Sequence, residues 1–333
     1  ELFRLVKHLQ ETENIAIIFI SHRIHEILQI CEKYTVMRNG VIVDTSPVTK
    51  ETTSREIVEK MLGRTFEEQF HKEKVQIGEK VFEVKNLCGA DGKVEDVSFY
   101  VRKGEIVGIA GLVGAGKSEL CKTIFGAYER TSGSVLLGGR ELKINNPSQA
   151  VKNGIALVPE ERRKEGVLVN ENVTLNLSAA ALSKFCNGSF VSKAKTEKNA
   201  HEYVEGLDIK TPSIKQHVKN LSGGNQQKLL FGRWITDEAK LLLLDEPTRG
   251  VDIKTKHEIY QRVRKMVEAN NAGALVVSSE LEELVLMCDK VLIIRDGHVE
   301  DVLTGDRITE NNMMAEITAS GNNKQQTEDN KSV

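Results

Sequence analysis

The spacing of apolar positions changes several times within the first sixty residues. A spacing of three or four residues is typical of one helix face, an unbroken apolar run of a buried strand, and Asn-Gly between two apolar segments of a β-hairpin. The last stretch with helical spacing stops at Gly63, and glycine is a residue type that ends helices. The sequence predicts a helix at 1–10, a buried strand at 15–20, a helix at 24–30, a hairpin around Asn39-Gly40 and a helix at 54–62 capped by Ser54.

This opening pattern returns near the end of the chain. Residues 1–40 align without a gap to 258–297, at a constant offset of 257 positions, with Cys31 on Cys288. Such a match indicates an internal repeat rather than chance similarity. We therefore expect two related domains in tandem, of which this chain, starting at Glu1 rather than Met, holds the end of the first and all of the second. The expected parts are 1–63 of the first domain, a charged linker at 64–80, the second domain at 81–316 and a disordered tail at 317–333.

Between the two copies the pattern is that of an α/β domain. The four leucines at 241–244 form a run that is typical of a strand buried on both faces, as in a parallel sheet covered by helices. The expected fold class is α/β, with a mostly parallel core sheet, an antiparallel β-subdomain and a helical subdomain. Strands are predicted at 81–85, 97–101, 106–110, 134–137 and 241–244, with a helix at 118–125 and a helical insert over 175–217.

The predicted strand at 106–110 leads into a phosphate-binding loop. Residues 111–118, GLVGAGKS, match G-x-x-x-x-G-K-[ST] at every fixed position. Glycines let backbone N–H groups curl around a polyphosphate, a lysine supplies charge for the β and γ phosphates, and a serine hydroxyl can bind Mg²⁺. The residues expected to hold a nucleotide here are Gly111, Leu112, Val113, Gly114, Ala115, Gly116, Lys117, Ser118 and Glu119.

Two acids follow the leucine run, at the strand end where ligands of open α/β sheets bind. We expect Asp245 to hold Mg²⁺ together with Ser118. Glu246 is then placed to polarise the water that attacks a terminal phosphate. A complete phosphate-binding loop in the same chain favours this interpretation over a solvated loop that merely begins with two acids.

Composition narrows the class of protein. The 46 basic and 48 acidic residues give a net charge of −2, which offers no electrostatic footprint for nucleic acid. No apolar run reaches the roughly 18 residues that cross a bilayer. The five cysteines are scattered without a C-x-x-C pair, which predicts reduced thiols rather than a zinc site.

With LSGGNQQ at 221–227, these motifs resemble those of the ATPase subunit of ABC transporters. The resemblance covers 81–316 and implies a P-loop NTPase fold that binds ATP and Mg²⁺. More narrowly, the tandem arrangement and several stretches are similar to the second cassette of bacterial importers for monosaccharides of the ribose, xylose and galactose type. These stretches are GLVGAGKSEL, VPEERRKEG, LSGGNQQK, DEPTRGVD and VSSELEEL.

The resemblance also implies head-to-tail cassettes, with each ATP held between one P-loop and the signature of the other cassette. Glu160 stands where most such ATPases have a glutamine that reaches the metal and senses the permease. His22 would be the γ-phosphate switch of the first cassette's site, and Ser279 occupies the switch position of the site at 111–118. The signature residues expected to close over the first cassette's ATP are Ser222, Gly223, Gly224, Asn225 and Gln226.

Because Glu160 and Ser279 depart from the family pattern, we expect this site to bind MgATP and to hydrolyse it slowly. The implied function is ATP-driven sugar import through integral-membrane permease subunits, at the cytoplasmic face of the membrane. The implied partners are those permeases, an extracytoplasmic sugar-binding protein indirectly and the other cassette of the same full-length chain, with no nucleic acid.

Two alternatives remain open at this point. The first is a truncated module that holds a nucleotide without hydrolysing it, since an isolated fragment is expected to be weak or inactive. The second is a non-transport ABC ATPase acting on nucleic acid or ribosomes. Such a protein would be expected to carry a basic linker, and 64–80 has no surplus of basic residues.

Overall fold

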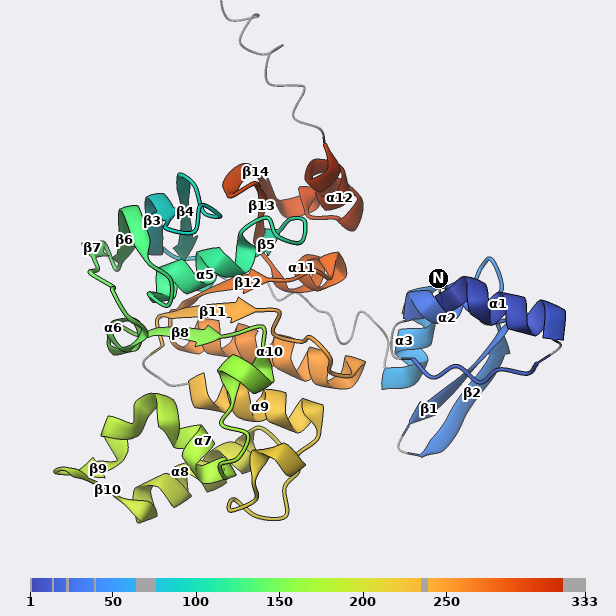
Figure 1. Cartoon of the computed structure of the whole chain (residues 1–333), viewed down its shortest axis with the longest axis horizontal. Helices are drawn as coiled ribbons and strands as arrows, with labels where there is room; N and C mark the ends of the chain where they lie inside the picture. Colours follow the sequence, from blue (N-terminus) through green and yellow to red (C-terminus); the bar gives the residue numbers. More distant parts are fainter. Residues whose placement is uncertain are drawn as a thin grey trace, which may run out of the picture. The chain divides into compact units, whose positions relative to one another are not determined.

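The computed structural model of the chain describes residues 2–13, 15–21, 24–38, 40–63, 76–234 and 239–319. They form two compact units, the first within 1–73 together with Asp252–His257 and the second made of the remainder (Figure 1). Among the helices that the structure describes, none combines the length and the apolar character needed to cross a membrane.

The first unit is built around a hairpin covered by a helix. Its small core holds Tyr34, Val36 and Ile57, all at most 5% exposed. The last helix begins after Thr53, whose side chain accepts a hydrogen bond from the Glu56 N–H, so the predicted cap at Ser54 is wrong by one residue. In chain order the elements are α1 (Leu2–Glu13), α2 (Ile24–Ile30), β1 (Lys33–Arg38), β2 (Val41–Pro47) and α3 (Ser54–Leu62), which ends at Gly63 as predicted.

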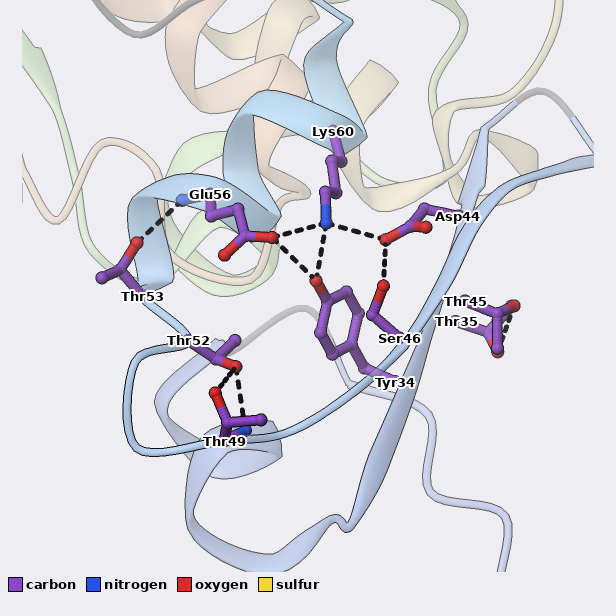
Figure 2. A network of polar contacts seen from close by, with 10 residues as sticks. All are labelled: Tyr34, Thr35, Asp44, Thr45, Ser46, Thr49, Thr52, Thr53, Glu56 and Lys60. Carbon is purple, nitrogen blue, oxygen red and sulfur yellow. Dashed lines mark hydrogen bonds and ion pairs between the residues drawn. The ribbon is translucent and has the colours of Figure 1, made fainter.

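A polar network ties α3 to the hairpin (Figure 2). Lys60 Nζ lies 2.8 Å from Asp44 Oδ2, 2.5 Å from Glu56 Oε1 and 2.9 Å from Tyr34 Oη. Hydrogen bonds from Lys60 and Ser46 hold the pKa of Asp44 below its usual range. Lys60 therefore joins residues of both hairpin strands to the helix that covers them.

The second unit contains a six-stranded sheet that is mostly parallel. Its strands β14 and β13 pair antiparallel, and the other neighbouring strands pair in parallel. Every residue of the four strands β5, β12, β11 and β8 is buried, and for β11 the leucine run predicts this burial. The strand order across the sheet is β14 (His298–Thr304), β13 (Lys290–Arg295), β5 (Ile106–Ala110), β12 (Gly273–Val277), β11 (Leu241–Asp245) and β8 (Ile155–Val158).

The two faces of this sheet pack into different cores. One core lies against a four-stranded antiparallel sheet, β4 (Val97–Arg102), β3 (Lys80–Gly89), β6 (Arg130–Leu137) and β7 (Arg140–Glu141), with α5 (Lys117–Phe125) and α6 (Pro147–Lys152). The other core is covered by α9 (Gly223–Trp234), α10 (Ile253–Ala269), α11 (Leu281–Met287) and α12 (Glu310–Thr318). The α/β fold class, with its antiparallel subdomain, is confirmed.

A helical insert packs on the second core through α7 and α8. It lies beside α9, at the far end of the unit from the antiparallel sheet (Figure 1). The last helix, α12, extends two residues beyond the domain end expected at 316. The insert contains α7 (Val173–Ser178), a 3₁₀ segment (Ala179–Phe185), β9 (Cys186–Asn187), β10 (Phe190–Val191) and α8 (Lys193–Gly206); short turns lie at Arg162–Gly166, Val218–Asn220 and Gly305–Arg307.

The sequence repeat is also a structural repeat. Adding 257 to the bounds of α2, β1 and β2 gives the bounds of α11, β13 and β14. Both hairpins shift register at the same point, after Val36 in one and after Ile293 in the other. The two copies therefore share details that their patterns of apolar residues do not specify.

The apolar run at 15–20 is not a strand, contrary to the sequence prediction. Ile18 and Ile20 are 91% and 93% exposed. The repeat explains the difference, because the corresponding strand of the second unit, β12, pairs with β5 on one side and β11 on the other. The described part of the first unit has only the hairpin strands, so backbone groups at 15–20 have no such neighbours there.

Candidate functional site

Backbone packing fixes the shape of the phosphate-binding loop between β5 and α5. Gly116 has φ +96°, and a Cβ at this position would lie 2.0 Å from the carbonyl oxygen of Lys93. A Cβ at Gly111 would lie 2.3 Å from the carbonyl oxygen of Ile294. These two glycines are thus required by the fold itself as well as by the approach of a polyphosphate.

Lys117 closes this loop with its ammonium group. Its Nζ donates to the carbonyl oxygens of Gly111 and Leu112, at 2.7 Å each. The residue is only 7% exposed, and burial lowers the pKa of its ammonium. Carbonyl dipoles are weaker partners than phosphate oxygens, so a polyphosphate in the loop would compete for this cation.

Asp245 provides a buried carboxylate beside the loop. Ser118 Oγ donates to Asp245 Oδ1 at 2.9 Å, whereas Oδ2 is buried and has no hydrogen-bond partner. Burial raises the pKa of Asp245 to about 7. A buried, unpartnered carboxylate oxygen next to a serine hydroxyl is a donor set that suits Mg²⁺.

Within the described ranges, no cluster of three or more His, Cys, Asp or Glu side chains is arranged to hold a metal ion. Beside nucleotides, Mg²⁺ is bound by one or two protein ligands together with phosphate oxygens and water. Ser118 and Asp245 are the residues that fit this role.

Glu246 and Ser279 are brought together at the ends of adjacent strands. Glu246 Oε1 accepts a hydrogen bond from the Ser279 N–H at 2.7 Å and a second one from Ser279 Oγ. Burial raises the pKa of Glu246. Glu246 also has φ +48°, a left-handed conformation that is costly for a residue with a side chain and that often occurs at functional sites.

Glu160 follows β8 at the same edge of the sheet. Its carboxylate forms an ion pair with the Arg249 guanidinium, a partner that the sequence motifs do not indicate. The negative charge of Glu160 contributes to the raised pKa values of Asp245 and Glu246. Three acids therefore converge where the parallel strands end.

The signature residues begin helix α9 and have other neighbours than the phosphate-binding loop. Ser222 is exposed, while Gly223 lies against Arg162 and the carbonyl oxygen of Gly250. Gly224 is half-buried in the first turn of the helix. Asn225 Nδ2 donates to Ser222 Oγ at 2.9 Å.

Gln226, predicted to close over the nucleotide of the other cassette, lies in the interior of this unit. Its side chain is fully buried, and Nε2 donates to the carbonyl oxygens of Val218 and Leu221 at 3.0 and 3.1 Å. These two bonds attach the first turn of α9 to the backbone that precedes it. Glu119 is also engaged within the unit, since its carboxylate accepts from Lys93 Nζ at 2.6 Å.

Of the other predicted residues, Leu112 and Val113 are exposed on the loop and Ala115 is buried beneath it. Gly114, at φ +85°, has open space where a Cβ would be. His22 lies outside the described residues.

Sequence reasoning missed residues that form hydrogen bonds with the loops carrying Glu246 and Ser279. Gln227 of α9 donates through Nε2 to the Pro247 carbonyl oxygen at 2.5 Å, next to Glu246. Thr248 and Ser278 both donate to Glu283. The sequence repeat carried a signal for the pair Ser278 and Glu283, because Ser21 and Glu26 occupy the corresponding positions of the first copy.

A protein-family model described as "ABC transporter" matches residues 94–249, a range that contains the loop, the signature and both acids. The ribose import ATP-binding protein RbsA of Clostridium tetani is 39% identical over 322 residues, which cover 96% of this chain and 63% of that protein. RbsA of Bacillus subtilis strain 168 is 38% identical over 318 residues, 96% of this chain and 64% of that protein. The chain thus spans less than two thirds of the length of these relatives.

Solved structures give the same fold. A nucleotide-free ATP-binding cassette from an ABC transporter has a TM-score of 0.60 and 21% identity, over 71% of this chain and 95% of the other. An ATP-binding subunit of an ABC transporter has a TM-score of 0.57 and 28% identity, over 72% and 95%.

Fold and site define a P-loop nucleotide-binding protein. Within that class, the matches are specific: residues 94–249 match the ABC transporter family, and nearly the whole chain is similar to ribose import ATP-binding proteins.

Proposed function

We propose that this chain is part of an ATP-binding and ATP-hydrolysing subunit that powers import of a monosaccharide through an ABC transporter permease. The observation that carries the proposal is the pairing of Ser118 with the buried Asp245 directly beside a complete phosphate-binding loop. The similarity of nearly the whole chain to two ribose import ATP-binding proteins supports a sugar as the cargo.

The residues of the site suggest a division of work. Lys117 would exchange its backbone carbonyl partners for the β and γ phosphates of ATP. Ser118 and Asp245 would hold Mg²⁺, which, when bound, neutralises charge that develops on the phosphates. Glu246 would orient the attacking water and accept its proton, with Ser279 holding its carboxylate.

The remaining predicted residues would serve contacts with partners. Ser222, Gly223 and Gly224 would close over the ATP of the other cassette, whose γ phosphate His22 would approach. Glu160, already paired with Arg249, would report on the metal site to the permease. We place the subunit at the cytoplasmic face of the membrane, with an extracytoplasmic sugar-binding protein as an indirect partner.

Ser279 favours slow hydrolysis at this site and also supports the second candidate, a module that binds nucleotide without hydrolysing it. A serine hydroxyl does not become a cation, so it offers a γ phosphate less charge stabilisation than a histidine can. The two candidates differ in turnover and share the binding step.

Uptake of labelled ribose, xylose and galactose by the source cells tests the transport proposal. A Lys117→Ala allele should abolish uptake of one of these sugars, and a Glu282→Gln allele, altered at an exposed position of α11, should leave it unchanged. Unchanged uptake of every monosaccharide in the Lys117→Ala strain would rule out sugar import as the function.

A further inference from the structure

Glu283 of α11 is a buried carboxylate that accepts hydrogen bonds from residues close in sequence to Glu246 and Ser279. It is 2% exposed. Its Oε1 accepts a hydrogen bond from Thr248 Oγ1 at 2.9 Å, and its Oε2 accepts one from Ser278 Oγ at 2.5 Å. Both donors are themselves only 1% exposed, so water does not compete for these bonds.

The two donors belong to the two loops that form the hydrolytic side of the site. Thr248 comes two residues after Glu246 in the loop after β11, and Ser278 immediately precedes Ser279 at the end of β12. Side chains therefore connect the loops in two places, in addition to the backbone bond from the Glu246 N–H to the Val277 carbonyl oxygen. The front connection is Glu246 to Ser279, and the rear connection runs from Thr248 through Glu283 to Ser278.

The bond between Glu246 and Ser279 depends on the rear connection to hold Glu246 in place. Glu246 is held at φ +48°, and strained conformations of this kind persist only where the surroundings fix them. Hydroxyl bonds to a buried carboxylate are charge-assisted and about twice as strong as neutral ones. A single carboxylate that accepts from both loops sets their separation, and with it the position of the Glu246 carboxylate relative to Ser279.

The first unit repeats the serine–glutamate bond of this arrangement. Ser21 Oγ donates to Glu26 Oε2 at 2.6 Å, and both residues correspond to Ser278 and Glu283 at the offset of 257. The two units differ at the next position, where His22 stands opposite Ser279. The serine–glutamate pair is thus kept while the switch residue changes, which indicates a role in holding the loop rather than in contacting a nucleotide.

We propose that Glu283 is a positioning residue for ATP hydrolysis, which fixes Glu246 against Ser279 through Thr248 and Ser278. The inference rests on the proposed function, since Glu246 must act on ATP for the position to matter. Glu283 itself touches no nucleotide in this account. Its removal should therefore reduce kcat and leave KM for ATP unchanged.

The test compares Glu283→Gln with Glu282→Gln, its exposed neighbour on α11, in the 333-residue chain. Glutamine keeps the size of the side chain and removes the charge that accepts from both hydroxyls. We expect kcat to fall by about tenfold or more, with KM for MgATP within about twofold of the parent value. In a Glu246→Gln background, Glu283→Gln should cause no further loss, because a positioning residue acts through the group it positions.

Amide hydrogen exchange supplies a readout that does not depend on turnover. The Ser279 N–H, bonded to Glu246 in the parent, should exchange at least about tenfold faster in Glu283→Gln, while β5 amides keep their rates. The proposal is overturned if Glu283→Gln behaves like Glu282→Gln, if KM rises as kcat falls, or if β5 exchange accelerates equally. If the parent chain neither binds nor hydrolyses ATP, the proposed function fails, and the Ser279 exchange rate still decides whether Glu283 holds the loop.

Discussion

Burial of the Asp245 carboxylate suits a metal ion, but it lowers the stability of the metal-free protein. Its pKa is raised to about 7 by burial, above the value of about 3.9 for an unfolded chain. The folded state therefore holds the proton more tightly, and this contribution to stability is complete below pH 4 and lost as the pH rises through 7. Binding a divalent cation reverses the balance, because the cation requires the carboxylate.

We therefore expect Asp245→Asn to stabilise the nucleotide-free chain at pH 8, by at most about 4 kcal/mol, and to leave it unchanged near pH 4. Mg²⁺-dependent nucleotide binding should strengthen between pH 6 and 8 in the parent and not in the variant. Urea unfolding and calorimetry at several pH values measure both effects. A variant less stable than the parent at pH 8 would show that the buried Asp245 carboxylate does not destabilise the folded chain.

Ser279 differs from His22, the residue at the corresponding position of the first copy. In a protein that carries both cassettes, Ser279→His should raise ATP turnover at this site, by roughly tenfold if the imidazole reaches the γ phosphate. Ser279→Ala, which keeps the backbone N–H bond to Glu246, is the matched control. Turnover in Ser279→His no higher than in the parent would contradict the role assigned to this position.

The loop between β5 and α5 contains a matched pair of glycines. Both Gly114 and Gly116 have positive φ, and only the second would bring a Cβ against a neighbouring carbonyl oxygen. Gly114→Ala should cost about 1–2 kcal/mol of unfolding free energy from the left-handed conformation alone. Gly116→Ala should cost more than about 3 kcal/mol, because Lys93 must also move. Equal losses in urea unfolding would show that the loop can shift away from Lys93.

Most elements of the second unit could be predicted from the sequence, because each carries a local signal. β5 and β11 are continuous apolar runs, and their observed bounds agree with the predicted ones to within a residue. The run at 15–20 has the same signal and forms no strand, since a strand depends on neighbours that a local pattern does not report. The burial of Gln226 was not predicted for a similar reason, because a motif gives residue order and not which side chains point inward.

The site could be predicted as far as its chemistry follows from residue type and strand ends. The sequence placed Ser118, Asp245 and Glu246 correctly together with the loop. It could not reveal the Arg249 partner of Glu160 or the rear connection through Glu283, since these depend on contacts between loops far apart in the chain.

The proposed function depends on where the chain binds nucleotide. The second unit should hold one MgATP in its own loop, and its signature should serve a different nucleotide. The two sets of residues are far apart in sequence and have different neighbours in the structure, Lys93 and Ile294 for the loop and Arg162 and Gly250 for the signature.

Calorimetric titration of MgATP into the chain tests this claim most directly. The parent should bind one MgATP, Lys117→Ala should weaken binding by roughly tenfold to a hundredfold through loss of charge-assisted bonds, and Ser222→Ala should bind like the parent. Circular dichroism of each variant controls for folding. Binding that survives Lys117→Ala, or that is lost equally in Ser222→Ala, would contradict the account.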